Sequence, residues 1–266
     1  MSGEAMDESY KQVYVDPSKT EAFVKRKWRS TEAELFESEK ELLGRIVKNG
    51  QSMLDVGCAS GGLYNILKQK FDALRYTGID IDSACISAAR REHPGATFVA
   101  GDLYQGGFKE DSFDVVVSLM TMSMQPDYKK FIQELVRVSG RYVLFDVRLK
   151  YEGSTIVDRD VSYFYYHGSG VRNYYVVHNV FELLNFLHVD SLHLKSIRID
   201  GYYPADKTSA LVPFPKSQLM TGMVCLEKYP KAERSRVVRQ GGFKEHADRP
   251  WCAVSVNLPG FEEGWL

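Results

Sequence analysis

A glycine-bearing turn between an apolar run and a helical pattern constrains the fold of this chain more than any other feature. The apolar run spans residues 52–56, the turn spans residues 57–62 with three glycines, and apolar side chains recur at helical spacing over residues 63–71. Glycine adopts backbone angles that other residues avoid, so such a turn can be tight and can lie close to a ligand. The pattern predicts a strand, a tight loop and a helix.

The same alternation continues along the chain. Amphipathic spacing predicts a helix over residues 32–47 and further helices after the second and fourth strands. Strands that alternate with helices at this spacing predict an α/β fold with a doubly wound, mostly parallel sheet. The apolar runs that predict strands after the first occupy residues 76–81, 97–100, 113–117, 142–145, 192–202 and 218–226.

The alternation stops after the fifth predicted strand. Residues 148–177 carry glycines, tyrosines and charges without a regular period, which predicts an insertion. Asn179, followed three residues later by Glu182, is typical of a capping box and predicts the start of a helix. We expect Phe181 to face inward from that helix.

Composition and the ends of the chain exclude several classes of protein. Lysine and arginine number 34 against 35 aspartates and glutamates, so the net charge of −1 gives no field that would attract nucleic acid or an anionic membrane. No apolar run approaches the roughly 20 residues that cross a bilayer, and the acidic N-terminus lacks the regions of a signal peptide. The four cysteines show no zinc-binding or disulfide spacing. We expect a cytoplasmic protein with no metal, no nucleic-acid partner and no membrane partner, and the sequence leaves homo-oligomer formation open.

Three acidic residues follow or end successive predicted strands. Asp55 precedes the glycine turn, Asp80 ends the second strand and Asp102 follows the third. The carboxyl ends of parallel strands meet at one edge of a sheet, where ligands bind. A glycine turn followed about 20 residues later by an acid suits the two hydroxyls of a ribose. These residues predict a nucleoside ligand.

Two nucleoside ligands compete at this point. A dinucleotide-binding oxidoreductase would carry Gly-x-Gly-x-x-Gly, whereas this chain has Gly57-x-Ala59-x-x-Gly62, and a pyrophosphate has little use for the carboxylate of Asp55. S-adenosylmethionine has a cationic amino acid end that suits Asp55 and an adenine amino group that suits Asp102. The pattern favours S-adenosylmethionine.

The chain resembles the class I S-adenosylmethionine-dependent methyltransferase family. The segment LDVGCASG at residues 54–61 is similar to the first motif of that family, with Ala59 where a glycine is usual, and an alanine there costs little provided that its φ is negative. The resemblance covers about residues 45–228 and implies a seven-stranded sheet whose last strand is antiparallel. Similarity to the second, third and fourth motifs lies at residues 78–81, 101–103 and 113–118.

The resemblance also implies a role for individual residues. The backbone near Gly57 and Gly61 would face the methionine portion of S-adenosylmethionine, Asp80 would hold the ribose, and Asp102 would bind the adenine amino group between Ile81 and Leu103. The expected cofactor-binding residues are Asp55, Gly57, Ala59, Gly61, Asp80, Ile81, Asp102, Leu103 and Leu119.

The fourth-motif region bears on the methyl acceptor. Residues 118–124 lack the Asn-Pro-Pro-Tyr run that in this family marks methylation of base or amide nitrogens. We therefore expect a small-molecule acceptor that is methylated at a hydroxyl, such as a hydroxyl of a sugar or secondary metabolite. A hydroxyl needs a general base, for which His167 is the candidate. His178 and Asp146 are alternatives, although Asp146 could equally form an ion pair with Arg148.

Other residues have both a functional and a structural interpretation. Met120, Met122 and Met124 could line an acceptor pocket or belong to the core. A basic N-terminal stretch that ends at Arg29 could close over the cofactor or form a solvated helix face. Tyrosines gather where the sheet pattern yields to the insertion, and their rings suit an acceptor molecule. The expected substrate-binding residues are Tyr14, Arg29, Tyr163, Tyr165 and Tyr166.

These predictions divide the chain into three parts. We expect an N-terminal helical lid segment over residues 1–44, and a catalytic domain over residues 45–230 with cap insertions near 148–177 and 203–217. Residues 231–266 would form a tail of undetermined structure. A non-catalytic S-adenosylmethionine-binding subunit remains the alternative function.

Overall fold

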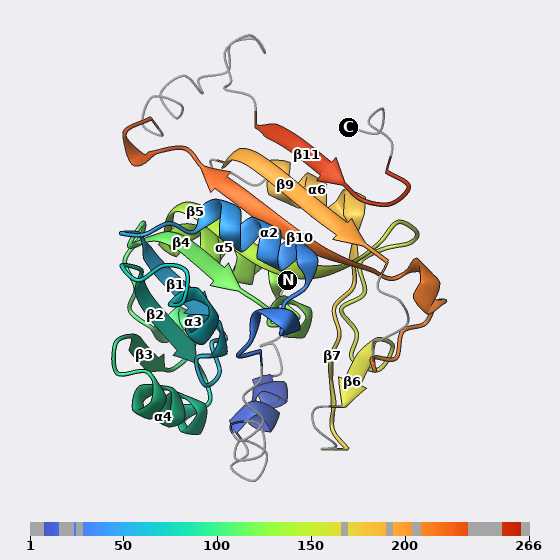
Figure 1. The fold of residues 1–266 in the computed structure, drawn as a ribbon. Coiled ribbons are helices and arrows are strands. Elements are labelled where there is room, and N and C mark those ends of the chain that lie inside the picture. Colours follow the sequence, from blue (N-terminus) through green and yellow to red (C-terminus); the bar gives the residue numbers. More distant parts are fainter. Residues whose placement is uncertain are drawn as a thin grey trace.

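A nine-stranded sheet runs through the chain (Figure 1). The computed structural model describes residues 8–15, 24, 29–165, 170–189, 194–203, 209–233 and 252–261. The strand order is β11-β9-β10-β5-β4-β1-β2-β3, and β8 pairs with the end of β5. The strands are β1 (Ser52–Val56), β2 (Arg75–Asp80), β3 (Thr97–Ala100), β4 (Phe113–Ser118), β5 (Ser139–Lys150), β8 (His178–Asn179), β9 (Leu194–Tyr202), β10 (Met220–Lys228) and β11 (Ala253–Asn257).

The predicted mostly parallel sheet is confirmed. Strand β10 is antiparallel to both of its neighbours, β5 and β9, and the other described pairings in this sheet are parallel. The predicted number of seven strands is wrong, because β8 and β11 extend the sheet. Strand β11 lies in the segment that was expected to be a tail, and its residues alternate between exposed and half-buried, so no apolar run marks it in the sequence.

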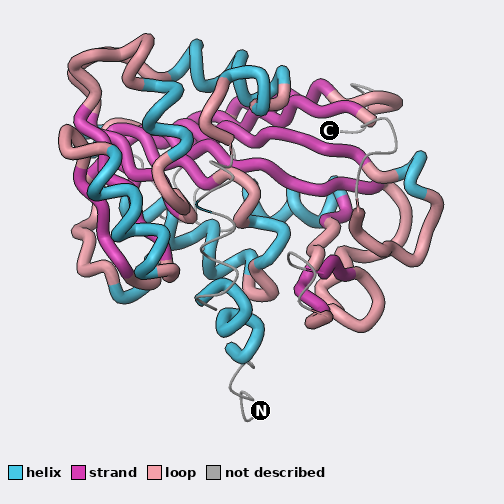
Figure 2. The backbone as a smooth tube through the Cα atoms, turned by 60° about the horizontal axis from the view of Figure 1, so that its bottom comes forward, coloured by secondary structure: helices cyan, strands magenta, loops and turns pink. Residues whose placement is uncertain are grey.

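Helices cover both faces of the sheet (Figure 2). Because alternate residues of a strand point to opposite faces, Val116 packs with α5 and α6 on one side, while Val115 and Val117 pack with α2 and α3 on the other. The helices are α2 (Glu37–Ile46), α3 (Gly62–Leu67), α4 (Ser83–Glu92), α5 (Tyr128–Val138) and α6 (Val180–Val189), with short 3₁₀ turns η1 (Glu8–Val15), η2 (Glu32–Glu34), η3 (Leu103–Gln105), η4 (Met122–Met124) and η6 (Lys216–Gln218). Within the described segments, no helix has both the length and the apolar character needed to span a membrane.

The predicted helix over residues 32–47 is broken into η2 and α2. Leu35 and Phe36 are extended, with ψ values of 144° and 154°, so the helix cannot run through them. The carboxylate of Glu39 accepts a hydrogen bond from the backbone N–H of Phe36 at 2.7 Å, which stabilises the start of α2.

The predicted capping box at α6 is half formed. Asn179 Oδ1 accepts hydrogen bonds from the backbone N–H groups of Phe181 and Glu182, at 2.9 and 3.1 Å. The carboxylate of Glu182, however, accepts from the backbone N–H of Thr155. Phe181 is 40% exposed and its ring packs against Phe261, so the prediction that it faces inward is wrong.

A two-stranded ribbon lies apart from the main sheet, where the insertion was predicted. Strands β6 (Tyr163–Tyr165) and β7 (Arg172–Tyr174) are antiparallel. Figure 1 shows this ribbon and the N-terminal turn η1 below the same edge of the sheet. The cap and the N-terminal segment therefore lie beside the carboxyl ends of β1, β2 and β4.

Candidate cofactor and acceptor site

A cavity of about 840 Å³ lies at the carboxyl edge of the parallel strands. Its walls come from the ends of β1, β2 and β4, from the loops that follow them, from the N-terminal segment and from the cap. Of the residues predicted to bind the cofactor, all but Gly61 line it: Asp55, Gly57, Ala59, Asp80, Ile81, Asp102, Leu103 and Leu119.

The turn after β1 is shaped by glycine conformations. Gly57 has φ of +80°, and a Cβ atom there would lie 2.2 Å from Thr121 Oγ1, so no side chain fits. The backbone N–H of Gly57 donates to the carbonyl of Ile79 at 2.8 Å, which joins the turn to β2. Gly61 also has positive φ, but a Cβ atom there would meet the rings of His93 and Phe98. The absence of a side chain at Gly61 therefore lets His93 and Phe98 pack against the start of α3.

Ala59 departs from expectation. Its φ is +48°, in the left-handed region, so the negative φ under which an alanine would cost little is not found. An L-residue there costs roughly 1–2 kcal/mol relative to the right-handed region. The backbone N–H of Ala59 donates to Asp80 Oδ2 at 2.8 Å, and this bond to a buried carboxylate helps to hold the strained residue.

The carboxylate of Asp80 spans the space between the first turn and the loop after β2. Its second oxygen accepts a hydrogen bond from the backbone N–H of Asp82 at 2.9 Å. Burial raises the pKa of Asp80 to about 6, and the backbone hydrogen bonds oppose that shift. A ribose that hydrogen-bonds to this carboxylate would compensate for its desolvation.

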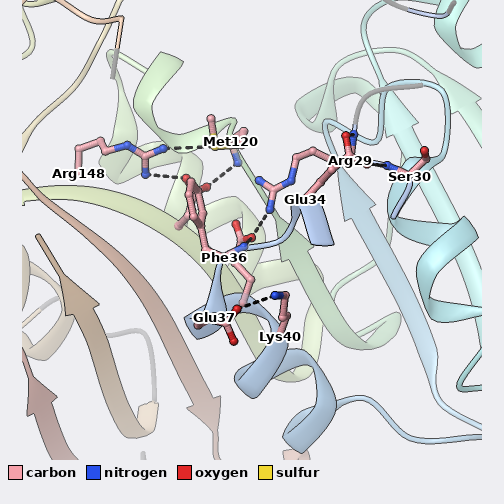
Figure 3. Close-up of polar contacts among 10 residues, drawn as sticks. Arg29, Ser30, Glu34, Phe36, Glu37, Lys40, Met120 and Arg148 are labelled. Carbon is pink, nitrogen blue, oxygen red and sulfur yellow. Dashed lines mark hydrogen bonds and ion pairs between the residues drawn. The ribbon is translucent and has the colours of Figure 1, made fainter. Parts of the chain in front are cut away.

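Asp55 and Arg29 place opposite charges at one end of the cavity. Burial raises the pKa of Asp55 to about 7, while a hydrogen bond from the Tyr76 hydroxyl and the positive charge of Arg29 lower it. Arg29 is 9% exposed and forms an ion pair with the buried Glu39 of α2 (Figure 3). Its Nε atom is buried and has no hydrogen-bond partner in the part of the chain that the structure describes. This end of the cavity is complementary to a zwitterionic amino acid.

The N-terminal turn η1 reaches across the cavity. Lys11 Nζ lies 2.8 Å from Asp102 Oδ2, on the side of β3. The hydroxyl of Tyr14 lies 3.0 Å from Asn173 Oδ1, on β7, and 2.8 Å from the sulfur of Met124. Lys11 and Tyr14 therefore connect the strand-end acids to the cap.

The rest of the cavity is mainly apolar. Met120 and Met124 line it, as the pocket interpretation predicts. Met122 is fully buried in the core, as the structural interpretation predicts. Leu35 and Phe36 come from the N-terminal side and Phe164 from the cap. We refer to this region as the acceptor half and to the region of the strand-end acids as the cofactor half.

The structure tests only part of the prediction for the cap tyrosines and the histidine base. Tyr165 lines the cavity. Tyr163 does not, and its ring packs between Tyr165 and the guanidinium of Arg172. Tyr166 and His167 lie outside the described residues.

The two alternative bases lie outside the cavity. Asp146 is 1% exposed, and its oxygens bind the backbone N–H of Met120 and the guanidinium of Arg148. His178 is fully buried against the ring of Tyr128, and burial lowers its pKa to about 3, so its imidazole is neutral.

Lining residues of the acceptor half that were absent from the predicted site include Arg148, Tyr175 and Tyr202. Tyr175 and Tyr202 belong to the tyrosine-rich stretch, and that excess was a usable signal. Arg148 gave no such signal, because a charged residue within a strand pattern is ordinarily exposed.

Comparison with known proteins supports the same assignment. Residues 53–140 match the family model described as "Methyltransferase domain". Residues 53–140 are thus similar to the methyltransferase domain of S-adenosylmethionine-dependent methyltransferases. The matched segment contains the glycine turn and the three strand-end acids.

Curated relatives match over a limited region. The chain is 36% identical to "Phthiotriol/phenolphthiotriol dimycocerosates methyltransferase 1" of Mycobacterium ulcerans over 101 residues, which cover 36% of this chain and 37% of the relative. It is 35% identical to "Fatty-acid O-methyltransferase" of Mycolicibacterium smegmatis over 108 residues, 39% of each chain. The similarity thus spans well under half of the length of these relatives.

A solved structure shares the fold over a longer region. Phosphoethanolamine N-methyltransferase 2 of Haemonchus contortus, in complex with S-adenosyl-L-methionine, superposes with a TM-score of 0.60. The superposition covers 86% of this chain and 61% of that chain at 16% identity. This likeness shows the fold.

Proposed function

We propose that this chain transfers the methyl group of S-adenosylmethionine to an oxygen atom of a small molecule with a largely apolar body. One observation carries the proposal: a single cavity joins the strand-end acids of the cofactor half to the apolar acceptor half. Bound S-adenosylmethionine would supply a methyl group on a cationic sulfur, which is open to attack by a nucleophile.

The cofactor half offers a partner for each part of that molecule. Asp80 would accept the ribose hydroxyls, and Asp102 the adenine amino group, between Ile81 and Leu103. Asp55 and Arg29 would face the ammonium and carboxylate of the amino acid end. The turn at Gly57 supports this assignment because its backbone lines the cavity next to Asp55.

The chain would catalyse transfer mainly by positioning and by excluding water. Methyl transfer is an in-line displacement, so holding the acceptor oxygen opposite the departing sulfur supplies much of the rate. Tyr14 and Lys11 of the N-terminal turn, together with the cap, would close the cavity over both reactants. We accordingly propose that residues 1–44 act as a lid segment, that residues 45–230 form the catalytic domain, and that 148–177 and 203–217 provide its cap.

The chemical class of the acceptor is a more specific part of the proposal. The sequence predicts a hydroxyl of a sugar or secondary metabolite, deprotonated by His167, which lies outside the described residues. The apolar lining of the acceptor half favours a molecule with a hydrocarbon or aromatic body over a bare sugar. The named substrates of the two curated relatives, a phthiotriol dimycocerosate and a fatty acid, have this character.

Calorimetry on the full chain tests the proposal. S-adenosylhomocysteine should bind to the wild-type chain, and Asp80→Asn should weaken that binding about tenfold or more, because hydrogen bonds to a charged group are lost. Asp72→Asn, an exposed matched control, should bind as the wild type does. NAD binding without S-adenosylhomocysteine binding would contradict the proposal. Cofactor binding with no methyl transfer to any acceptor would favour a non-catalytic subunit.

A further inference from the structure

Arg148 is a buried arginine whose guanidinium borders the acceptor half. It lies on β5, is 4% exposed and lines the cavity. Its Nη1 donates to Asp146 Oδ2 at 2.8 Å and to the carbonyl of Val147 at 3.2 Å. Its Nε donates to the hydroxyl of Tyr175 at 3.0 Å. Two of its three nitrogens are therefore bound to oxygen.

Among the described residues, the third nitrogen of the guanidinium has only a sulfur partner. Nη2 of Arg148 lies 3.2 Å from the sulfur of Met120, and Figure 3 shows this contact. A thioether is a weak acceptor, and a buried charged donor without a strong acceptor is costly. Arginine presents its N–H groups as a planar fork that matches a carboxylate. Nη2 is thus available to an oxygen anion in the cavity.

The position of Arg148 places this donor beside the turn that faces the methionine portion in the proposed function. Met120 lies in the loop that follows β4, and its neighbour Thr121 packs directly against Gly57. Met120 has φ of +61°, and its backbone N–H donates a hydrogen bond to Asp146 Oδ1 at 2.5 Å. The pair of Asp146 and Arg148 therefore fixes both the loop and the guanidinium that lies against it.

Among the described residues of the acceptor half there is no carboxylate or imidazole that could deprotonate a hydroxyl. The carboxylates that line the cavity are Asp55, Asp80, Asp82 and Asp102, and all of them follow or end β1, β2 or β3. No described histidine lines it. An acceptor that is already an anion requires no base, because its oxygen carries the attacking electron pair.

We propose that the acceptor is the carboxylate of a largely apolar acid, bound by Nη2 of Arg148, and that the product is its methyl ester. The inference rests on the proposed function and narrows its acceptor oxygen. The carboxylate oxygen forms a bond to the methyl carbon, the bond from that carbon to sulfur breaks, and its electron pair stays on the sulfur. The negative charge of the acid and the positive charge of the sulfonium are both consumed, and no proton is transferred.

The ion pair of Arg148 leaves one side of its guanidinium for an anionic ligand. Asp146 pairs with Nη1, so the charged donor at Nη2 has no carboxylate partner among the described residues. Burial alone would lower the pKa of Arg148, but the charge of Asp146 raises it overall, so the guanidinium stays protonated. The sulfonium of a bound cofactor would add a further positive charge.

Binding of paired acids and alcohols tests this inference. The full chain is saturated with S-adenosylhomocysteine and titrated by calorimetry with octanoate, laurate, benzoate and cinnamate, and with the alcohol of the same skeleton in each case. We expect at least one acid to bind about tenfold or more tightly than its alcohol, because only the acid forms a charge-assisted bond to Arg148.

Two variants assign that preference to Arg148. Arg148→Lys keeps the charge but loses the fork, and the double variant Arg148→Met with Asp146→Asn removes the ion pair without leaving a lone buried charge. Both should abolish the preference for the acid. Asp146→Asn keeps an oxygen that can accept from the backbone N–H of Met120, so the loop beside Gly57 should stay in place and S-adenosylhomocysteine should still bind. Arg75→Lys, an exposed arginine at the opposite end of β2, should retain the preference.

The outcomes separate this inference from the proposed function. Failure to bind S-adenosylhomocysteine would count against both. If it binds but none of the four acids does, or if acids and alcohols bind alike, the carboxylate acceptor is wrong while methyl transfer to another oxygen stands. Acid preference that survives both Arg148 variants would also overturn it. With S-adenosylmethionine, mass spectrometry should detect a methyl ester of the acid that binds, whereas a methyl ether of an alcohol would contradict the inference.

Discussion

The cofactor half and the acceptor half of the cavity are built in different ways. The cofactor half takes its acids from the ends of consecutive strands β1, β2 and β3, within 50 residues of sequence. The acceptor half combines residues from the N-terminal segment, β5, the cap and β10, which are far apart in the chain. The first half depends on the backbone geometry of a parallel sheet, whereas the second depends on which side chains the tertiary fold brings together.

The strongest test of the cofactor half is its glycine turn. Gly57→Ala would force a Cβ atom against Thr121 and a strained φ, so we expect a loss of S-adenosylhomocysteine affinity of about a hundredfold, on the order of 3 kcal/mol. Calorimetry measures this. Gly50→Ala is the matched control, since Gly50 has φ of +83° with nothing within 4 Å of its Cβ position. Equal effects on cofactor binding would show that strain alone, and not contact at the turn, is responsible.

The ion pair of Arg29 and Glu39 tests the boundary between the halves. Arg29→Met leaves the buried Glu39 without its partner and should lower the free energy of unfolding by about 3 kcal/mol. Adding Glu39→Gln should restore most of that stability but not the cofactor affinity, if Arg29 contacts the amino acid end. Urea unfolding and calorimetry give the two quantities. Recovery of both in the double variant would contradict that role.

The raised pKa of Asp55 predicts a dependence on pH. Its pKa is about 7 in the folded chain and lower in the unfolded chain, so the folded chain binds the extra proton. The free energy of unfolding should therefore fall as the pH rises from the ordinary range of an aspartate to about 7. Asp55→Asn should flatten this dependence in thermal melts, whereas Asp72→Asn should not. A slope that persists in Asp55→Asn would assign it to Asp80 instead.

The affinity for the cofactor should change with pH in the direction opposite to the free energy of unfolding. An ionised Asp55 would attract the ammonium group, so affinity for S-adenosylhomocysteine should rise several-fold between pH 6 and pH 8. Calorimetry at both values measures the change. An affinity that is independent of pH would place the ammonium away from Asp55.

The smallest expected effect concerns Ala59. Because its φ is +48°, Ala59→Gly should raise the free energy of unfolding by up to about 1 kcal/mol. Ala84→Gly, at an exposed position of α4, should lower it by a similar amount, since glycine weakens a helix. Urea unfolding measures both. Destabilisation by both substitutions would show that the methyl group of Ala59 contributes packing.

The difference between the halves also explains what could be predicted. Strands β1 and β3 have the predicted bounds, because short apolar runs bounded by polar or turn residues mark them in the sequence. Strand β5 was predicted over residues 142–145 only, since the buried charges of Asp146 and Arg148 interrupt its apolar run. Strand β11 has no buried face, so no apolar pattern marks it in the sequence.

The same reasoning applies to the site. The three strand-end acids were predictable because parallel strands end at one edge. The burial of Arg148 was not, because the sequence does not show that Asp146 and Arg148, which share one face of β5, both point into the fold. The left-handed conformation of Ala59 was likewise invisible in a sequence without a glycine there.

A crystal structure of the chain with S-adenosylhomocysteine tests the central claim most directly. We expect the ribose hydroxyls on Asp80, the adenine between Ile81 and Leu103, and the amino acid end beside Asp55 and Arg29. A nucleoside bound away from the carboxyl ends of β1 and β2, with Asp80 still free of ligand, would contradict it.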